Sequence, residues 1–229
     1  MQSFKPKHTA EEYLSSLEKK VDELKRRSEL PRYSNPASEQ DKVVAHFIGR
    51  SIQLAVACSR VGDLPTPLGA LSRVLCDDLI RLAWVTRSAN NAADYAKTVL
   101  SEHAKLIRVN LAKKHGKIID RNTGKDATAA FIPQLAAFIN KGKNIEQIAA
   151  ECGLGKLYDI PFRFASLETH GNTFLGDASP YDSESATLAA LPAVISFVRV
   201  ATLIADNYPN TVTSAEDILR VLRLDKIAA

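Results

Sequence analysis

The long apolar run at residues 188–205 constrains the fold more than any other feature of the chain. It approaches the ~20 residues that a membrane-spanning helix needs, yet it contains Pro192 and Arg199. A central arginine is costly in lipid, so a helix packed inside a bundle explains the run better than a membrane span. We therefore expect no membrane association. We also expect Arg199 to pair with Asp77 or Asp78, because a buried and unpaired arginine would be strongly destabilising.

The rest of the chain is dominated by the 3.6-residue periodicity of helices, without a convincing strand. The chain of 229 residues is long enough for one helical domain with a sizeable core. The sequence therefore predicts an all-α protein, a single bundle of eight or nine helices. The expected helices cover residues 9–30, 38–57, 66–87, 92–115, 126–140, 145–152, 160–170, 183–207 and 214–224.

The first expected helix has only a narrow apolar seam. Its apolar positions are spaced 3, 4 and 3 residues apart, at Leu14, Leu17, Val21 and Leu24. Lysines and arginines occupy its other faces, so we expect an N-terminal helical arm over residues 1–35 and a helical bundle domain over 36–229. The arm either lies on the bundle or pairs with a second copy, which would make the protein a homo-oligomer through this helix.

Composition places the protein in a reducing compartment. Cys58, Cys76 and Cys152 are far apart and include no C-x-x-C pair, so their spacing fits neither a disulfide framework nor a zinc site. We expect a cytoplasmic protein with no cofactor and no metal. The net charge of +4 comes from basic residues interspersed with acids, which leaves RNA contact open but gives no reason to expect specific DNA binding.

The expected helix at 66–87 carries charged residues on an otherwise apolar pattern. Arg73, Asp77 and Arg81 stand at i, i+4 and i+8, which places an acid between two bases on one face. This stripe is either a set of ion pairs on a packed helix or part of a polar pocket inside the bundle. Asp77 and Arg81 are therefore candidate binding residues.

The expected helix at 92–115 places a histidine among apolar residues. Val99, His103, Leu106 and Ile107 share one face. We expect His103 to lie in the core with its hydrogen bonds satisfied, and we retain it as a candidate binding residue.

The segment 145–156, IEQIAAECGLGK, is similar to the first helix and turn of a helix-turn-helix. A recognition helix would have to start near Lys156, but the residues that follow are apolar and include Pro161. A short helix ended by glycine is the simpler interpretation. A DNA-binding regulator acting through 145–160 is kept as an alternative.

The next expected helix offers two side chains suited to phosphate chemistry. Arg163 and His170 are seven residues apart, which puts them on one face roughly 10 Å apart along the axis, with Ser166 between them. The arginine presents forked donors for phosphate oxygens. The histidine lies in the last turn, where it would serve as a cation or a proton shuttle.

Two runs resemble a family of uncharacterised, all-helical bacterial proteins known only as a domain of unknown function. They are ALSRVLCDDLIRLAWVTRSANNAADYAK and GLGKLYDIPFRFASLETHGN, and the resemblance covers about two thirds of the chain. It implies an acid in the earlier helix, at Asp77 or Asp78, but supplies no reaction. The later part of the family pattern falls on Tyr158, Phe162, Ser166 and His170.

Arg163, six intervening residues and His170 also resemble the R-x(4-6)-H motif of HEPN ribonucleases. The resemblance implies metal-independent RNA cleavage, with His170 assisting attack of a 2′-hydroxyl and Arg163 stabilising the developing charge. The sequence departs from the motif at Phe164, where a polar residue is usual. Alternatively, Arg163 pairs with a carboxylate such as Asp159 or Glu168, and the histidine caps its own helix.

The leading expectation is a helical binding or interaction protein without established catalytic activity. A HEPN-like metal-independent ribonuclease is the first alternative, with Arg163 and His170 as catalytic residues, and a DNA-binding regulator is the second. Whether the protein is an enzyme stays open. The candidate binding residues are Asp77, Arg81, His103, Tyr158 and Ser166.

Overall fold

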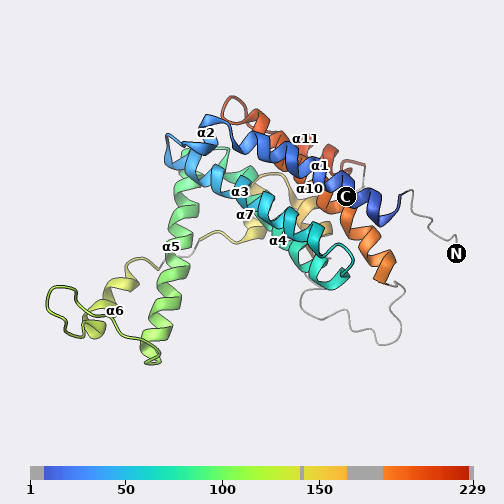
Figure 1. Cartoon of the computed structure of the whole chain (residues 1–229). Coiled ribbons are helices and arrows are strands. Elements are labelled where there is room, and N and C mark those ends of the chain that lie inside the picture. The colour runs from blue at the N-terminus through green and yellow to red at the C-terminus, as the bar shows by residue number, and fades with distance from the viewer. Residues whose placement is uncertain (1–7, 140–141, 164–182, 227–229) are drawn as a thin grey trace.

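The computed structural model describes residues 8–139, 142–163 and 183–226 (Figure 1). Within these ranges the regular structure is helical and includes no strand, which confirms the all-α prediction. The elements are α1 (Ala10–Ser28), α2 (Pro31–Ser34), α3 (Glu39–Arg60), α4 (Pro65–Val85), α5 (Ala89–Ala112), α6 (Thr128–Ala136), α7 (Ile145–Glu151), α8 (Gly155–Leu157), the π-helical turn η1 (Tyr158–Phe162), α10 (Ser183–Asn207) and α11 (Ala215–Val221).

Helix α4 lies at the centre of the fold and packs against α3, α10 and α7. It is apolar on most sides, so a helix of this sequence is stable only when other helices surround it. Its fully buried side chains include Leu75, Leu79 and Leu82. The main core is built around this helix, with α3 and α10 as its largest contacts.

The narrow seam of α1 belongs to the same core. Leu17, Val21 and Leu24 are at most 3% exposed, and α1 packs against α10 and α3. Helices α10 and α3 of the same chain therefore cover the apolar seam of α1, which was a possible contact for a second copy. The division into 1–35 and 36–229 stays a prediction about independent folding.

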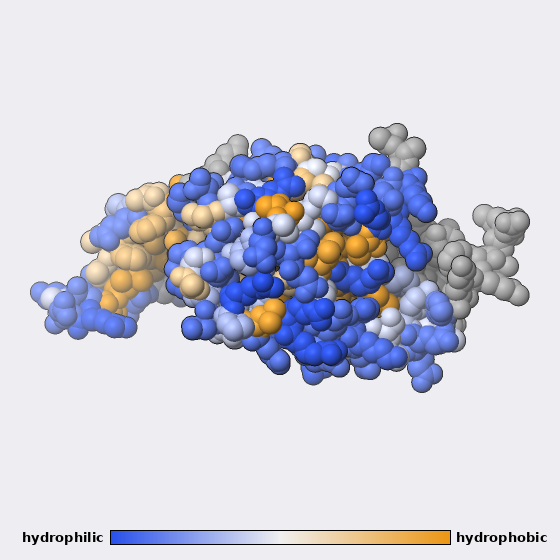
Figure 2. All heavy atoms as spheres, turned by 90° about the horizontal axis from the view of Figure 1, so that it is seen from above, coloured by the Kyte–Doolittle hydropathy of each residue, from blue (hydrophilic) through white to orange (hydrophobic). Residues whose placement is uncertain are grey.

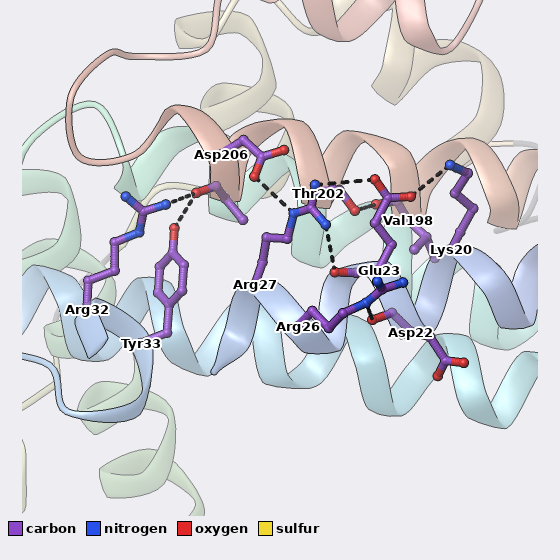
Figure 3. Close-up of polar contacts among 11 residues, drawn as sticks. Lys20, Asp22, Glu23, Arg26, Arg27, Arg32, Tyr33, Val198, Thr202 and Asp206 are labelled. Atoms are coloured by element: carbon purple, nitrogen blue, oxygen red, sulfur yellow. Dashed lines mark hydrogen bonds and ion pairs between the residues drawn. The ribbon is translucent and has the colours of Figure 1, made fainter. Parts of the chain in front are cut away.

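Polar contacts fasten α1 and α2 to the end of α10 (Figure 3). Arg27 Nε donates to Asp206 Oδ1 at 3.1 Å. The guanidinium of Arg32 and the hydroxyl of Tyr33 both donate to the carbonyl oxygen of Ala205, at 2.8 and 2.7 Å. This carbonyl lies near the C-terminus of α10, where cationic donors also interact favourably with the helix dipole.

Local capping signals place the helix starts well. Thr9 with Glu12 and Ser38 with Asp41 form reciprocal capping boxes at the starts of α1 and α3. Helix α4 begins at Pro65, one residue before the expected start at residue 66. A proline in the first turn needs no intrahelical N–H bond, so the helix starts there without a side-chain cap.

Helix α10 has the bounds that the sequence predicts. Among the described residues, the segment Ala190–Asn207 of this helix has the length and the apolar composition needed to cross a membrane. Half of the segment (50%) is buried inside the fold. Arg199 is exposed while its neighbours Val198 and Val200 are buried. The expectation of a buried Arg199 is wrong, because α10 keeps one face in solvent.

The second half of α5 leaves the body of the protein. Figure 1 shows this half extending away from the other long helices, with α6 and its flanking loops beside it. A small separate core holds α6 there, formed by Ala104, Leu111 and Leu135. We call residues 99–139 the α5–α6 projection.

Candidate functional site

The two acids of α4 pair with two different arginines. Asp78, 4% exposed, accepts a hydrogen bond from Arg50 Nε of α3 at 2.8 Å. Asp77 accepts one from Arg81 Nε at 3.1 Å, one turn along the same helix. The hypothesis that either acid pairs with Arg199 is therefore wrong. Both acids already have cations close by, and Arg199 faces solvent.

Burial dominates the electrostatics of Asp78. Desolvation raises the pKa of its carboxyl, and the hydrogen bond from Arg50 only partly opposes this effect. Such a pair is held by geometry and surrounding packing, and it contributes less stability than its short distance suggests. The row of charged residues on α4, Arg73, Asp77 and Arg81, thus contains the Asp77–Arg81 ion pair that the i, i+4 spacing predicts.

A hollow of about 240 Å³ lies between α4, α5 and the segment leading into α7, and Arg81 and Tyr95 line it. Each cation around it already has an acidic partner: Arg81 has Asp77, Lys97 has Asp94, and Lys143 has Glu151. Trp84 also lines the hollow but is only 2% exposed, and its Nε1 donates to Glu151 Oε1 at 3.1 Å. The hollow offers a ligand little accessible surface and no unneutralised charge.

Arg163 is also neutralised. Its guanidinium lies 3.2 Å from Asp159 Oδ1 and 3.5 Å from Glu146 Oε1, and it stacks 5.1 Å from the ring centroid of Tyr158. Pairing of Arg163 with Asp159 was one part of the alternative to a HEPN-like site, and this part is confirmed; the histidine cap that completed that alternative stays a prediction. Ser166, Glu168 and His170 lie outside the described residues, so the HEPN-like pair stays a prediction.

The segment 145–160 ends its helix at a glycine, as its simpler interpretation predicts. Gly153 has φ +70°, and the next amide, Leu154 N–H, donates back to the Ala149 carbonyl, which is a Schellman-type helix end. Between Gly153 and Arg163 the described chain forms only α8 and η1, in which Leu157 and Phe162 are buried. This part of the chain presents no exposed helix to a DNA groove.

His103 is exposed, so the expectation of a core histidine is wrong. The sequence correctly placed His103 on one face with Val99, Leu106 and Ile107. No other described part of the chain covers this face. Helix α6 packs on the neighbouring face of α5 through Ala104 and Leu111, and the body ends before this part of α5 (Figure 1).

We call this uncovered face the α5 stripe. Leu100 is 55% exposed, Leu106 60% and Ile107 39%. Figure 2 shows apolar side chains on the part of the molecule that protrudes at the left, with hydrophilic side chains at its far end. The stripe residues are Val99, Leu100, His103, Leu106, Ile107 and Asn110. This surface is the candidate functional site, because large contiguous apolar surface is uncommon on a monomer and marks interaction sites.

The spacing within the stripe is that of a helix-pairing seam. Val99, His103, Leu106 and Asn110 are separated by 4, 3 and 4 residues, which keeps them on one side of the helix over three turns. At 3.6 residues per turn, Lys105 and Arg108 fall on the other side of α5. The sequence contained this pattern, but it does not reveal whether the same chain covers the face.

The cysteines do not supply a nucleophile. Cys58, Cys76 and Cys152 are buried and free. Burial raises the pKa of the Cys58 thiol to about 12 and that of Cys152 to about 11. Thiols of this kind are inert at neutral pH, because the thiolate is the reactive form.

A family model described as a family of unknown function (DUF5677) matches residues 41–179. The match includes α4 to α8 and most of α3, and so contains the whole α5 stripe. No curated protein and no solved structure matches the chain. The family match confirms the resemblance to an uncharacterised helical domain.

Proposed function

The chain belongs to the family of unknown function DUF5677, and we propose that it is a non-enzymatic interaction protein that binds a second copy of itself along the α5 stripe. The exposed apolar face of α5 carries this proposal. We also place the protein in the cytoplasm, since three free, buried cysteines suit a reducing compartment.

Apolar exposure is concentrated on one element. Of the large apolar side chains that are exposed among the described residues, most lie in the α5–α6 projection: Leu100, Leu106, Ile107, Val109, Ile119 and Phe138. Burying a side chain such as Leu106 gains about 1.5–3 kcal/mol. Pairing two stripes would bury several at once, which gives the isolated projection a strong tendency to associate.

A second copy suits the stripe better than a charged partner does. The stripe contains no lysine, arginine, aspartate or glutamate, and Lys113 follows it at the next seam position, at the end of α5. Over the length of the stripe itself, two copies meet without like-charge repulsion. His103 and Asn110 occupy equivalent seam positions one heptad apart, and a polar residue at such a position fixes register in paired helices. Lys105 and Arg108 stay on the outer side.

We expect the double variant Leu106→Gln, Ile107→Gln to remain folded and to lose self-association. The parent should sediment as a dimer with twice the 25.0 kDa chain mass. Loss of four buried apolar side chains per dimer should raise the dimer Kd at least about 100-fold. Sedimentation velocity over a concentration series measures this shift, and thermal unfolding checks the fold.

The matched control is Leu64→Gln, Val212→Gln. These residues are 49% and 50% exposed but lie outside the projection, so the control removes similar exposed apolar surface. It should leave the dimer Kd unchanged. A parent that sediments as a monomer at every concentration, or a dimer that withstands the stripe variant, contradicts the proposal.

A further inference from the structure

The α5–α6 projection carries the whole net charge of the protein. Residues 99–139 contain seven lysines and arginines against three acids, a net charge of +4. The complete chain also has a formal net charge of +4, so the remainder is neutral. The basic residues that the sequence shows as dispersed therefore form an excess on one protruding element.

Most of these cations have no acidic partner. Lys105 pairs with Glu102 at 2.7 Å. The other six form no ion pair within the described part of the chain, and all are exposed. We call these six the basic surface: Arg108, Lys113, Lys114, Lys117, Arg121 and Lys125.

The two remaining acids of the projection are engaged in turns. The Asp120 carboxylate accepts hydrogen bonds from the backbone N–H groups of Asn122 and Thr123 and from the Thr123 hydroxyl. Asp126 accepts one from the Thr128 N–H. These bonds lower the pKa of both carboxyls. The nearby charge of Lys117 also lowers the pKa of Asp126. Both acids mainly serve the local backbone, and neither forms an ion pair with one of the six cations among the described residues.

We propose that the basic surface binds the sugar-phosphate backbone of nucleic acid, without reading base sequence. Its cations extend from the outer side of α5 across the loops beyond its end, so a chain of regularly spaced phosphates can neutralise several of them together. A small anion would meet only one or two. Asn122 and Thr123 lie among the loop cations and are of the side-chain types that contact phosphate and sugar.

Nucleic acid fits this surface better than an anionic membrane does. Lipid binding by a basic helix relies on large apolar side chains beside the cations. Here Leu100, Leu106 and Ile107 lie in the α5 stripe, and Arg108 lies on the other side of the helix. Ile119 is the single large apolar side chain that is exposed among the other five cations, between Lys113 and Lys125, in the described chain. The six cations also follow a protruding element that is accessible to a polymer (Figure 1).

The test measures binding of the full chain to fluorescein-labelled single-stranded RNA, duplex RNA and duplex DNA by fluorescence anisotropy at several salt concentrations. Three phosphate contacts on single-stranded RNA should give a slope of log affinity against log salt of about −2. The triple variant Lys113→Glu, Lys117→Glu, Lys125→Glu should weaken binding at low salt at least about tenfold. Comparison of the three probes identifies which nucleic acid is preferred.

The matched control reverses three exposed cations of α1, Lys19→Glu, Lys25→Glu and Arg26→Glu, and so changes the net charge equally. It should lose much less affinity. Equal losses in the two triple variants, or no binding of any nucleic acid at low salt, overturn the proposal. Binding only to vesicles that contain phosphatidylserine also overturns it and assigns the surface to lipid. None of these outcomes depends on the dimer, which sedimentation tests separately.

Discussion

Replacing Arg50 by methionine should lower the free energy of unfolding by about 3 kcal/mol at pH 7, because it leaves a buried carboxylate without its cation. The carboxylate is that of Asp78, which lies on the central helix and is 4% exposed. Arg50 itself has a side chain that is 41% exposed, so methionine retains its packing and removes mainly the charge. Urea unfolding of parent and variant measures the difference.

The same variant should show an altered pH dependence. The folded pKa of Asp78 lies above its ordinary value because of desolvation, and the hydrogen bond from Arg50 lowers it. Loss of Arg50 therefore raises this pKa further. A carboxyl with a raised folded pKa stabilises the fold fully below its unfolded pKa, and this contribution is lost as pH rises through the folded pKa. The deficit of the variant should shrink as pH falls from 7 towards about 4.

A second substitution separates the charge effect from packing. Asp78→Asn in the Arg50→Met background removes the buried charge and should recover part of the lost stability at pH 7. Asp77→Asn in the same background is the matched control, since Asp77 is paired with Arg81 and less buried. A stability deficit that stays constant with pH, or equal effects of the two asparagines, would show that the Asp78 charge is not the cause.

Local sequence signals determined much of the fold. The capping boxes at Thr9 and Ser38, the bounds of α10 and the glycine end at Gly153 depend on residues within a few positions of each other. The i, i+4 pair of Asp77 and Arg81 is of the same kind. Such features are predictable because helix geometry alone brings the groups together.

The errors concern contacts between distant parts of the chain. Asp78 and Arg50 are 28 residues apart and lie on two helices, and nothing in the local pattern favours Arg50 over Arg199. The stripe with His103 has the periodicity of a buried face. Its exposure follows from where the body ends and which side α6 covers, and helical periodicity does not report either fact.

The sequence predicted which residues share the α5 face, but it did not predict that this face is exposed and available to a partner. Val99, His103, Leu106 and Ile107 were identified as one face, and the basic loop after α5 is visible in the sequence. These residues are exposed because the second half of α5 extends away from the body of the protein (Figure 1). The sequence left open whether the apolar seam on α1 lies on the bundle or pairs with a second copy. That seam is buried at Leu17 and Leu24, whereas the stripe on α5 is not.

Leu24→Ala should cost about 3 kcal/mol of unfolding free energy, because Leu24 is 0% exposed in the core that α1 shares with α10 and α3. Leu30→Ala is the matched control, since Leu30 is 39% exposed, and it should change stability by less than about 0.5 kcal/mol. Urea unfolding followed by far-UV circular dichroism measures both.

Deletion of residues 1–35 is the stronger form of this experiment. It removes the seam and the contacts to Asp206 and the Ala205 carbonyl shown in Figure 3, and it exposes the apolar faces of α10 and α3. The shortened chain should lose cooperative thermal unfolding, because each helix bundle needs its apolar faces covered. A shortened chain that unfolds cooperatively at the parental midpoint would establish α1 as an appended arm and refute its place in the core.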